Sequence, residues 1–119
     1  MDLPPLGRRD RIPTAAIDDV VHQIVERFDP ERIILFGSYA TGQARAESDV
    51  DLLVVMETPL SEAEQAARIC QAIDYHFGLD LIVRSPSTLG RRLTLGDPFL
   101  SQVVTGGKVL HERTHRRVG

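Results

Sequence analysis

Apolar residues recur at helical spacing in the first third of the chain. Between Thr14 and the dipeptide Asp29-Pro30 they occupy Ile17, Val20, Val21, Ile24, Val25 and Phe28. Positions three and four residues apart lie on one face of a helix. Threonine is a favourable N-cap, and proline prevents a helix from continuing. The pattern predicts an amphipathic helix that buries one face.

Later in the chain the apolar residues form short continuous runs instead. These runs cover about 32–36, 50–56 and 79–83, and turn-forming residues separate them. Continuous apolar runs of this length, rich in valine, isoleucine and leucine, are typical of buried strands. A fourth, shorter strand is expected at 108–110, after two consecutive glycines.

Two more helices are expected between the strands. Ser61 and Glu64 form a capping box, and Gly78 suits the left-handed position after the helix end. Its apolar stripe comprises Ala66, Ile69, Cys70, Ile73 and Phe77. Asp97 and Pro98 mark the start of a short helix. The apolar face of this helix comprises Phe99, Leu100, Val103 and Val104. The Ser/Pro/Gly-containing stretch before it is interpreted as a connection.

The alternation of helices and strands indicates one α/β domain. We expect a small mixed sheet of about four strands flanked by α-helices. The domain is predicted over residues 13–112, with a flexible N-terminal arm at 1–12 and a polar, basic tail at 113–119. The length of 119 residues fits a single domain with a modest core.

Composition narrows the class of protein. Apolar residues make up 42% of the chain and charged residues 26%, which is ordinary for a globular domain. A formal net charge of −3 argues against direct nucleic-acid binding. No apolar run is long enough to span a membrane, and the N-terminus lacks the apolar stretch of a signal peptide, so a cytoplasmic location is expected. The one cysteine, Cys70, is interpreted as a packing residue.

Candidate chemistry lies between the first two predicted strands. There Gly37, Ser38, Asp49 and Asp51 form the spacing Gly-Ser-x₁₀-Asp-x-Asp. Glycine lets backbone approach a phosphate, and the serine hydroxyl can donate to it. Two carboxylates two residues apart in a strand project to one face, where they repel each other unless a cation or proton intervenes. Mg²⁺ prefers such carboxylates together with substrate phosphates, so a metal-dependent phosphoryl or nucleotidyl transfer site is predicted.

Asp80 is a third candidate carboxylate. It interrupts the apolar run at 79–83, where an unpaired charge is costly, and it shares the parity of Ile82. If this strand lies beside the one that carries Asp51, Asp80 can join the pair as a metal ligand or act as a general base. The alternative is a strand-end aspartate bonded to neighbouring backbone.

The Gly-Ser-x₁₀-Asp-x-Asp spacing resembles the signature of the DNA polymerase β-like nucleotidyltransferases. The fuller stretch Gly-Ser-Tyr-Ala-Thr-Gly-Gln-Ala-Arg-x-x-Ser-Asp-Val-Asp-Leu-Leu-Val is similar to the minimal nucleotidyltransferases, which are often antitoxins of HEPN-type RNase toxins. The resemblance is strongest over about 30–84 and implies a single-domain nucleotidyltransferase fold.

Position by position, the resemblance implies a set of site residues. Gly37 and Ser38 would contact nucleotide phosphates. Asp49 and Asp51 would hold Mg²⁺, with Asp80 as the third carboxylate. Arg45 falls where such proteins often have a basic residue that contacts phosphate. An exposed loop arginine is an equally good interpretation of Arg45.

The implied activity is Mg²⁺-dependent transfer of a nucleoside monophosphate, most simply AMP from ATP, to a hydroxyl. The family suggests a tyrosine on a HEPN-type toxin as the acceptor, because a domain this small would rely on another polypeptide to present it. Two alternatives stay open. The protein can be a non-catalytic antitoxin that masks its toxin, or a stand-alone small-molecule nucleotidyltransferase that acts as a homo-oligomer.

Overall fold

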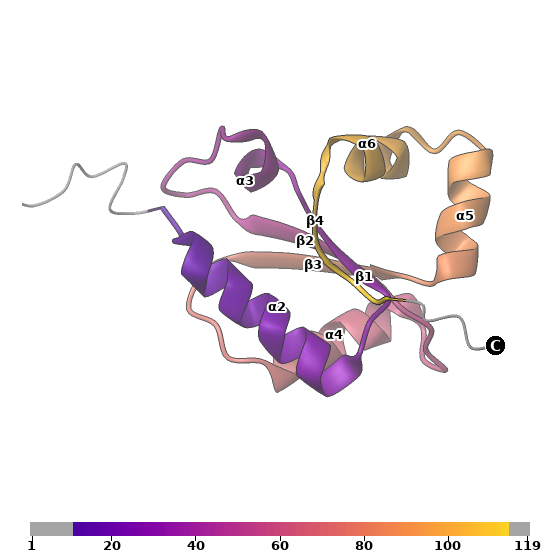
Figure 1. Cartoon of the computed structure of the whole chain (residues 1–119), viewed down its shortest axis with the longest axis horizontal. Coiled ribbons are helices and arrows are strands. Elements are labelled where there is room, and N and C mark those ends of the chain that lie inside the picture. Colours follow the sequence, from indigo (N-terminus) through magenta and orange to yellow (C-terminus); the bar gives the residue numbers. More distant parts are fainter. Residues whose placement is uncertain (1–10, 115–119) are drawn as a thin grey trace, which may run out of the picture.

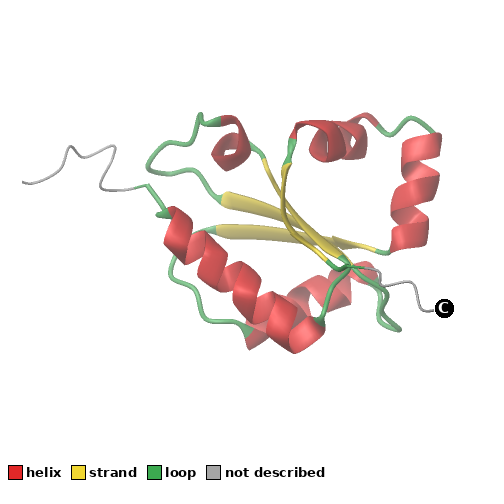
Figure 2. Cartoon of the chain, viewed as in Figure 1, coloured by secondary structure: helices red, strands yellow, loops and turns green. Residues whose placement is uncertain are grey.

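A mixed four-stranded sheet with helices on both faces forms the body of the protein (Figures 1 and 2). The structure is a computed structural model that describes residues 11–114. Most of the expected N-terminal arm and of the expected basic tail, residues 1–10 and 115–119, lies outside the described residues. Across residues 11–114, no helix combines the length and apolarity needed to cross a membrane.

The sheet has the strand order β3-β2-β1-β4. Its strands are β1 (Arg32–Phe36), β2 (Val50–Val55), β3 (Leu79–Arg84) and β4 (Lys108–Glu112). β1 runs antiparallel to both β2 and β4, whereas β2 and β3 are parallel. The expectation of a small mixed α/β sheet is therefore confirmed, and β3 does lie beside β2, as the hypothesis for Asp80 required.

Two helical layers cover the two faces of the sheet. The helices α2 (Thr14–Phe28) and α4 (Glu62–Ala72) lie below the sheet in Figure 1, while α5 (Pro86–Thr94) and α6 (Pro98–Gly106) lie above it. The short α3 (Ser38–Thr41) follows β1 directly. Alternate strand residues supply the two cores: Ile33 packs in the cluster with α2, and its neighbour Ile34 packs in the cluster with α6. This alternation decides on which face each strand side chain lies.

The expected second helix ends earlier than predicted. α4 stops at Ala72, Ile73 is extended, and Gly78 does not have a positive φ angle. A tertiary contact explains the early end: the Asp74 N–H donates to Gln23 Oε1 at 2.8 Å, and Gln23 Nε2 donates to the Asp74 carbonyl at 2.9 Å. Since α2 satisfies this backbone, residues after Ala72 leave the helix even though their apolar spacing continues it.

The stretch after β3 is a helix and not the predicted connection. Ser85 Oγ accepts from the Thr88 N–H at 3.1 Å, Pro86 occupies the first turn, and Leu89 is buried on the sheet. Ser-Pro followed by threonine is a recognisable helix start, so the signal was present in the sequence. A second difference is that Phe99, expected on the buried face of its helix, is 48% exposed.

Candidate active site

Register places two of the candidate carboxylates side by side. Asp51 of β2 pairs with Asp80 of β3 on one side and with Phe36 of β1 on the other. Directly paired residues of neighbouring strands project to the same face. Asp51 has the parity of Leu53, which packs under α6, so this row lies on the face covered by α5 and α6.

The carboxylates of Asp49 and Asp51 reach toward different glycines. A Cβ at Gly37 would collide with Asp51 Oδ2 and would lie 3.2 Å from its Cγ, whereas a Cβ at Gly78 would collide with Asp49 Oδ1. Gly37 also has φ 74° and ψ −153°, a conformation reserved for glycine. The glycine of the motif is therefore required twice, by its backbone conformation and by the carboxylate packed against it.

Burial and neighbouring negative charges both act on the Asp51 carboxyl group. Burial raises the pKa of its carboxyl group, and the negative charges of Asp80 and Asp49 raise it further. A carboxylate with a raised pKa binds a proton or a cation more readily than an isolated one. A proton or a cation near Asp51 would relieve the repulsion from Asp80 and Asp49.

No group of three His, Cys, Asp or Glu side chains within residues 11–114 is arranged to hold a metal ion. The divergence of Asp49 toward Gly78 and of Asp51 toward Gly37 is consistent with this. The donor chemistry still fits Mg²⁺, because this ion usually takes one or two protein carboxylates and completes its shell with water and phosphate oxygens.

The Gly-Ser loop leads straight from β1 into α3. The Gly37 carbonyl accepts from the Ala40 N–H at 3.0 Å, and Ser38 is the first helical residue. Within the described part of the chain, the Ser38 hydroxyl makes no hydrogen bond. The phenolic oxygen of Tyr39 accepts from the Ile12 N–H at 3.0 Å, which ties the helix to the start of the described chain. Ser38 therefore has a hydroxyl available for a ligand.

Arg45 lies in the loop between α3 and β2. It is exposed, and its main-chain N–H donates to Ser48 Oγ at 2.8 Å. The structure gives the Arg45 side chain no contact with the acidic residues, so its phosphate contact stays a prediction.

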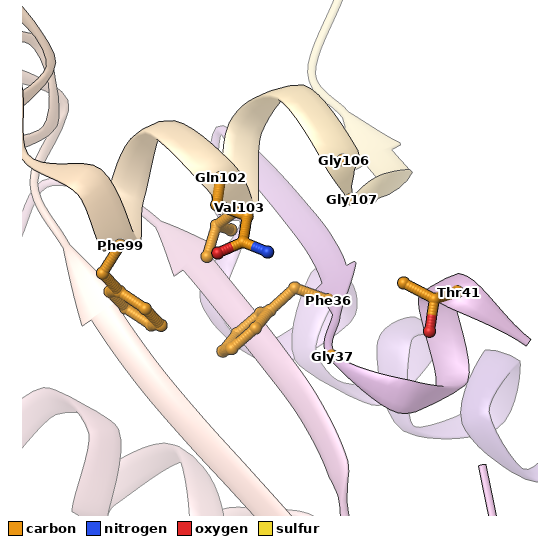
Figure 3. Close-up of a pocket in the computed structure, with 8 residues that line it drawn as sticks. All are labelled: Phe36, Gly37, Thr41, Phe99, Gln102, Val103, Gly106 and Gly107. Carbon is orange, nitrogen blue, oxygen red and sulfur yellow. The ribbon is translucent and has the colours of Figure 1, made fainter. Parts of the chain in front are cut away.

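A pocket of about 280 Å³ adjoins Gly37 (Figure 3). It is lined by Phe36, Gly37, Thr41, Phe99, Gln102, Val103, Gly106 and Gly107. The rings of Phe36 and Phe99 meet edge to face with centroids 5.6 Å apart. The sequence interpretation missed this pocket because α6, which supplies one of its walls, is distant in sequence from β1 and α3. Phe99 was predicted to be buried in the core, but it is half exposed and lines this pocket.

Comparison with known proteins agrees with this geometry. The family model described as "Nucleotidyltransferase domain" matches residues 17–111. "Putative protein adenylyltransferase MJ1305" of Methanocaldococcus jannaschii is 29% identical over 82% of this chain and 70% of its own length. "Putative protein adenylyltransferase MJ0141" of the same organism is 32% identical over 65% of this chain and 75% of its own length.

A solved structure shows the same fold. One chain of a toxin–antitoxin crystal structure with AMP-PNP superimposes with a TM-score of 0.53 and 27% identity, over 82% of this chain and 74% of that one. Together with the family match, which covers the Gly-Ser loop and all of the sheet except the last residue of β4, this establishes the class of protein. The chain belongs to the nucleotidyltransferase domain family of enzymes.

Proposed function

We propose that this nucleotidyltransferase moves AMP from ATP to a hydroxyl of a HEPN-type RNase toxin and thereby acts as its antitoxin. The observation that carries the proposal is the position of Asp51, which lies between Asp80 and the glycine of the Gly-Ser loop. Support for the protein acceptor comes from two relatives that are named as adenylyltransferases of proteins and from the similarity to a toxin–antitoxin chain.

Each residue has a defined task in the proposed transfer. Gly37 and Ser38 hold the phosphates that will leave, since the Ser38 hydroxyl is available and Gly37 keeps the loop in contact with the Asp51 carboxylate. Asp80, across from the loop, accepts the proton of the attacking hydroxyl. The hydroxyl oxygen forms a bond to the α-phosphorus, the bond between that phosphorus and the bridging oxygen breaks, and pyrophosphate leaves.

Asp49 and Asp51 would hold Mg²⁺ in this proposal. The ion would supply charge stabilisation for the attacking and leaving oxygens. Burial is the largest cause of the raised pKa of the Asp51 carboxyl group, and the negative charges of Asp80 and Asp49 raise this pKa further. The contribution of these two charges supports the assignment, because a bound cation would relieve the same repulsion.

Intact mass measurement tests the proposal. The protein is incubated with ATP, Mg²⁺ and a HEPN-type RNase toxin, and the mass of the toxin is measured. We expect a gain of one adenylyl group that requires Mg²⁺ and disappears in Asp49→Ala and Asp51→Ala. Asp18→Ala, which removes an exposed acid from α2, serves as the matched control and should retain full activity.

One result would overturn catalysis, and another would overturn the acceptor. If the toxin is inhibited without any change in mass, and inhibition survives Asp49→Ala and Asp51→Ala, the protein masks its toxin by binding. If a small-molecule hydroxyl is modified while the toxin is not, the acceptor is wrong although the transfer chemistry is right.

A further inference from the structure

The pocket beside Gly37 continues the row of site residues across the sheet. Asp51 pairs with Phe36, and Phe36 forms the floor of the pocket. Asp80 lies on the opposite side of Asp51. Asp51 is therefore flanked by Asp80 on β3 and, on β1, by the phenylalanine that lines this pocket.

The lining of the pocket is suited to a flat ring and not to phosphate. Six of its eight lining residues are phenylalanine, valine or glycine. No lysine, arginine or histidine lines it. In Figure 3 the carboxamide of Gln102 reaches from α6 toward Phe36, and Thr41 stands across from it on α3. An apolar wall with one or two polar groups is the usual composition of a pocket that orients a small organic ligand.

The size of the pocket limits what it can hold. Its volume of about 280 Å³ lies just under the range of about 300–1,000 Å³ that encloses a drug-sized molecule. A single fused ring system fits, whereas a complete nucleoside triphosphate does not. Because Gly37 belongs to both the pocket and the phosphate loop, a ligand whose phosphates lie at the loop can place its ring in the pocket.

We propose that this pocket receives the nucleobase of the donor nucleotide, with the ring packed against Phe36 and Phe99 and its hydrogen-bonding edge recognised by the Gln102 carboxamide. A carboxamide donates and accepts at once, which matches the adjacent amino group and ring nitrogen of adenine. Guanine presents the corresponding edge with donor and acceptor exchanged, so the orientation of the Gln102 carboxamide decides between the two bases, and we propose the orientation that favours ATP over GTP. This inference rests on the proposed function, since it assumes that the Gly-Ser loop holds the phosphates.

Calorimetric titration of the full chain with Mg²⁺ and AMP-PNP, the GTP analogue GMP-PNP or inorganic tripolyphosphate tests the inference. We compare Phe99→Ala and Gln102→Leu with two exposed control changes outside the pocket, Leu95→Ala and Gln71→Leu. Loss of a base-stacking ring weakens binding on the order of tenfold. We expect that loss for AMP-PNP in Phe99→Ala, a reduced preference for AMP-PNP over GMP-PNP in Gln102→Leu, and wild-type behaviour in both controls.

Tripolyphosphate separates the pocket from the phosphate site. Its affinity should be the same in wild type and in both pocket variants. Wild-type affinity for AMP-PNP in Phe99→Ala and Gln102→Leu would overturn the nucleobase assignment and leave the proposed function intact. Unchanged AMP-PNP binding with a raised KM for the acceptor would assign the pocket to the acceptor instead. If wild type binds none of the three probes, the proposed function and this inference both fail.

Discussion

Replacing Gly37 with alanine tests the central feature of the site. Its φ of 74° and ψ of −153° fall in a region that costs a residue with a Cβ about 1–3 kcal/mol. The new methyl group would also displace the Asp51 carboxylate, which packs where the Cβ must go. We expect Gly37→Ala to lower the free energy of unfolding by about 3 kcal/mol, from the upper end of the strain range with the displacement included.

Two other glycines separate these contributions. Gly42 has φ 81° and ψ 12°, and a Cβ there would meet no atom within 4 Å, so Gly42→Ala tests strain alone, at about 1 kcal/mol. Gly78 lacks a positive φ, but a Cβ there would collide with the Asp49 carboxylate. Because Asp49 is exposed and can turn into water, Gly78→Ala should leave stability nearly unchanged and still impair transfer.

Urea unfolding followed by far-ultraviolet circular dichroism measures these differences. With an m-value of about 2 kcal/mol/M, Gly37→Ala should shift the midpoint by roughly 1.5 M and Gly42→Ala by about 0.5 M. Adenylyl transfer is measured on the same samples below the transition. We expect activity to be lost in Gly37→Ala and Gly78→Ala and retained in Gly42→Ala.

The reasoning fails if Gly37→Ala and Gly42→Ala are equally stable, because the contact with Asp51 would then contribute nothing. It also fails if Gly37→Ala retains activity, since the carboxylate would not need its present position.

Three further changes address charge, capping and packing. Asp51→Asn should raise stability at pH 7: the wild-type protein, with its raised Asp51 pKa, loses stability as the pH rises from the usual aspartate pKa of 3.8 through the raised value, and asparagine avoids that loss. Its advantage should vanish below pH 3.8, while activity at pH 7 is abolished. Asp97→Ala removes the acceptor for the Leu100 N–H, at 3.0 Å, and should cost about 1 kcal/mol in urea unfolding. Ile69 of α4 is fully buried, so Ile69→Ala leaves a cavity in the core and should lower the free energy of unfolding by about 2–5 kcal/mol in the same assay.

Each of these expectations has a result that contradicts it. A gain in stability for Asp51→Asn that is equal at pH 3 and pH 7 would mean that repulsion is not its source. If Asp97→Ser, which keeps a capping oxygen, is no more stable than Asp97→Ala, the loss comes from the missing charge near Arg92 and not from the cap. Retention of wild-type stability in Ile69→Ala would be incompatible with its complete burial.

Local patterns determined most of the fold. The four strands and the helices α2 and α6 follow from apolar spacing, and the Asp97 cap of α6 was predicted as well; these signals act between neighbours in sequence. The N-cap expected at Thr14 was wrong, because Thr14 is the first helical residue of α2 and follows Pro13, which makes no side-chain cap bond.

Another error arose where a tertiary contact overrides spacing. Gln23 of α2 makes hydrogen bonds with the backbone of Asp74, and α4 therefore ends at Ala72 although the apolar spacing continues beyond it. The helix α5 was missed for a different reason. Its N-terminal cap, Ser85 followed by Pro86, is a local signal that is present in the sequence.

For the site, the sequence by itself determined the chemical groups: a glycine and serine after one strand, two acids at the start of the next, and a third acid in a strand of matching parity. Only the tertiary structure decided their arrangement. Sheet register set Asp80 beside Asp51, and close backbone packing turned Asp51 toward Gly37 and Asp49 toward Gly78. It also joined β1, α3 and α6 around one pocket. Parity and spacing are local properties of a chain, whereas register and cavities depend on which distant segments pack together.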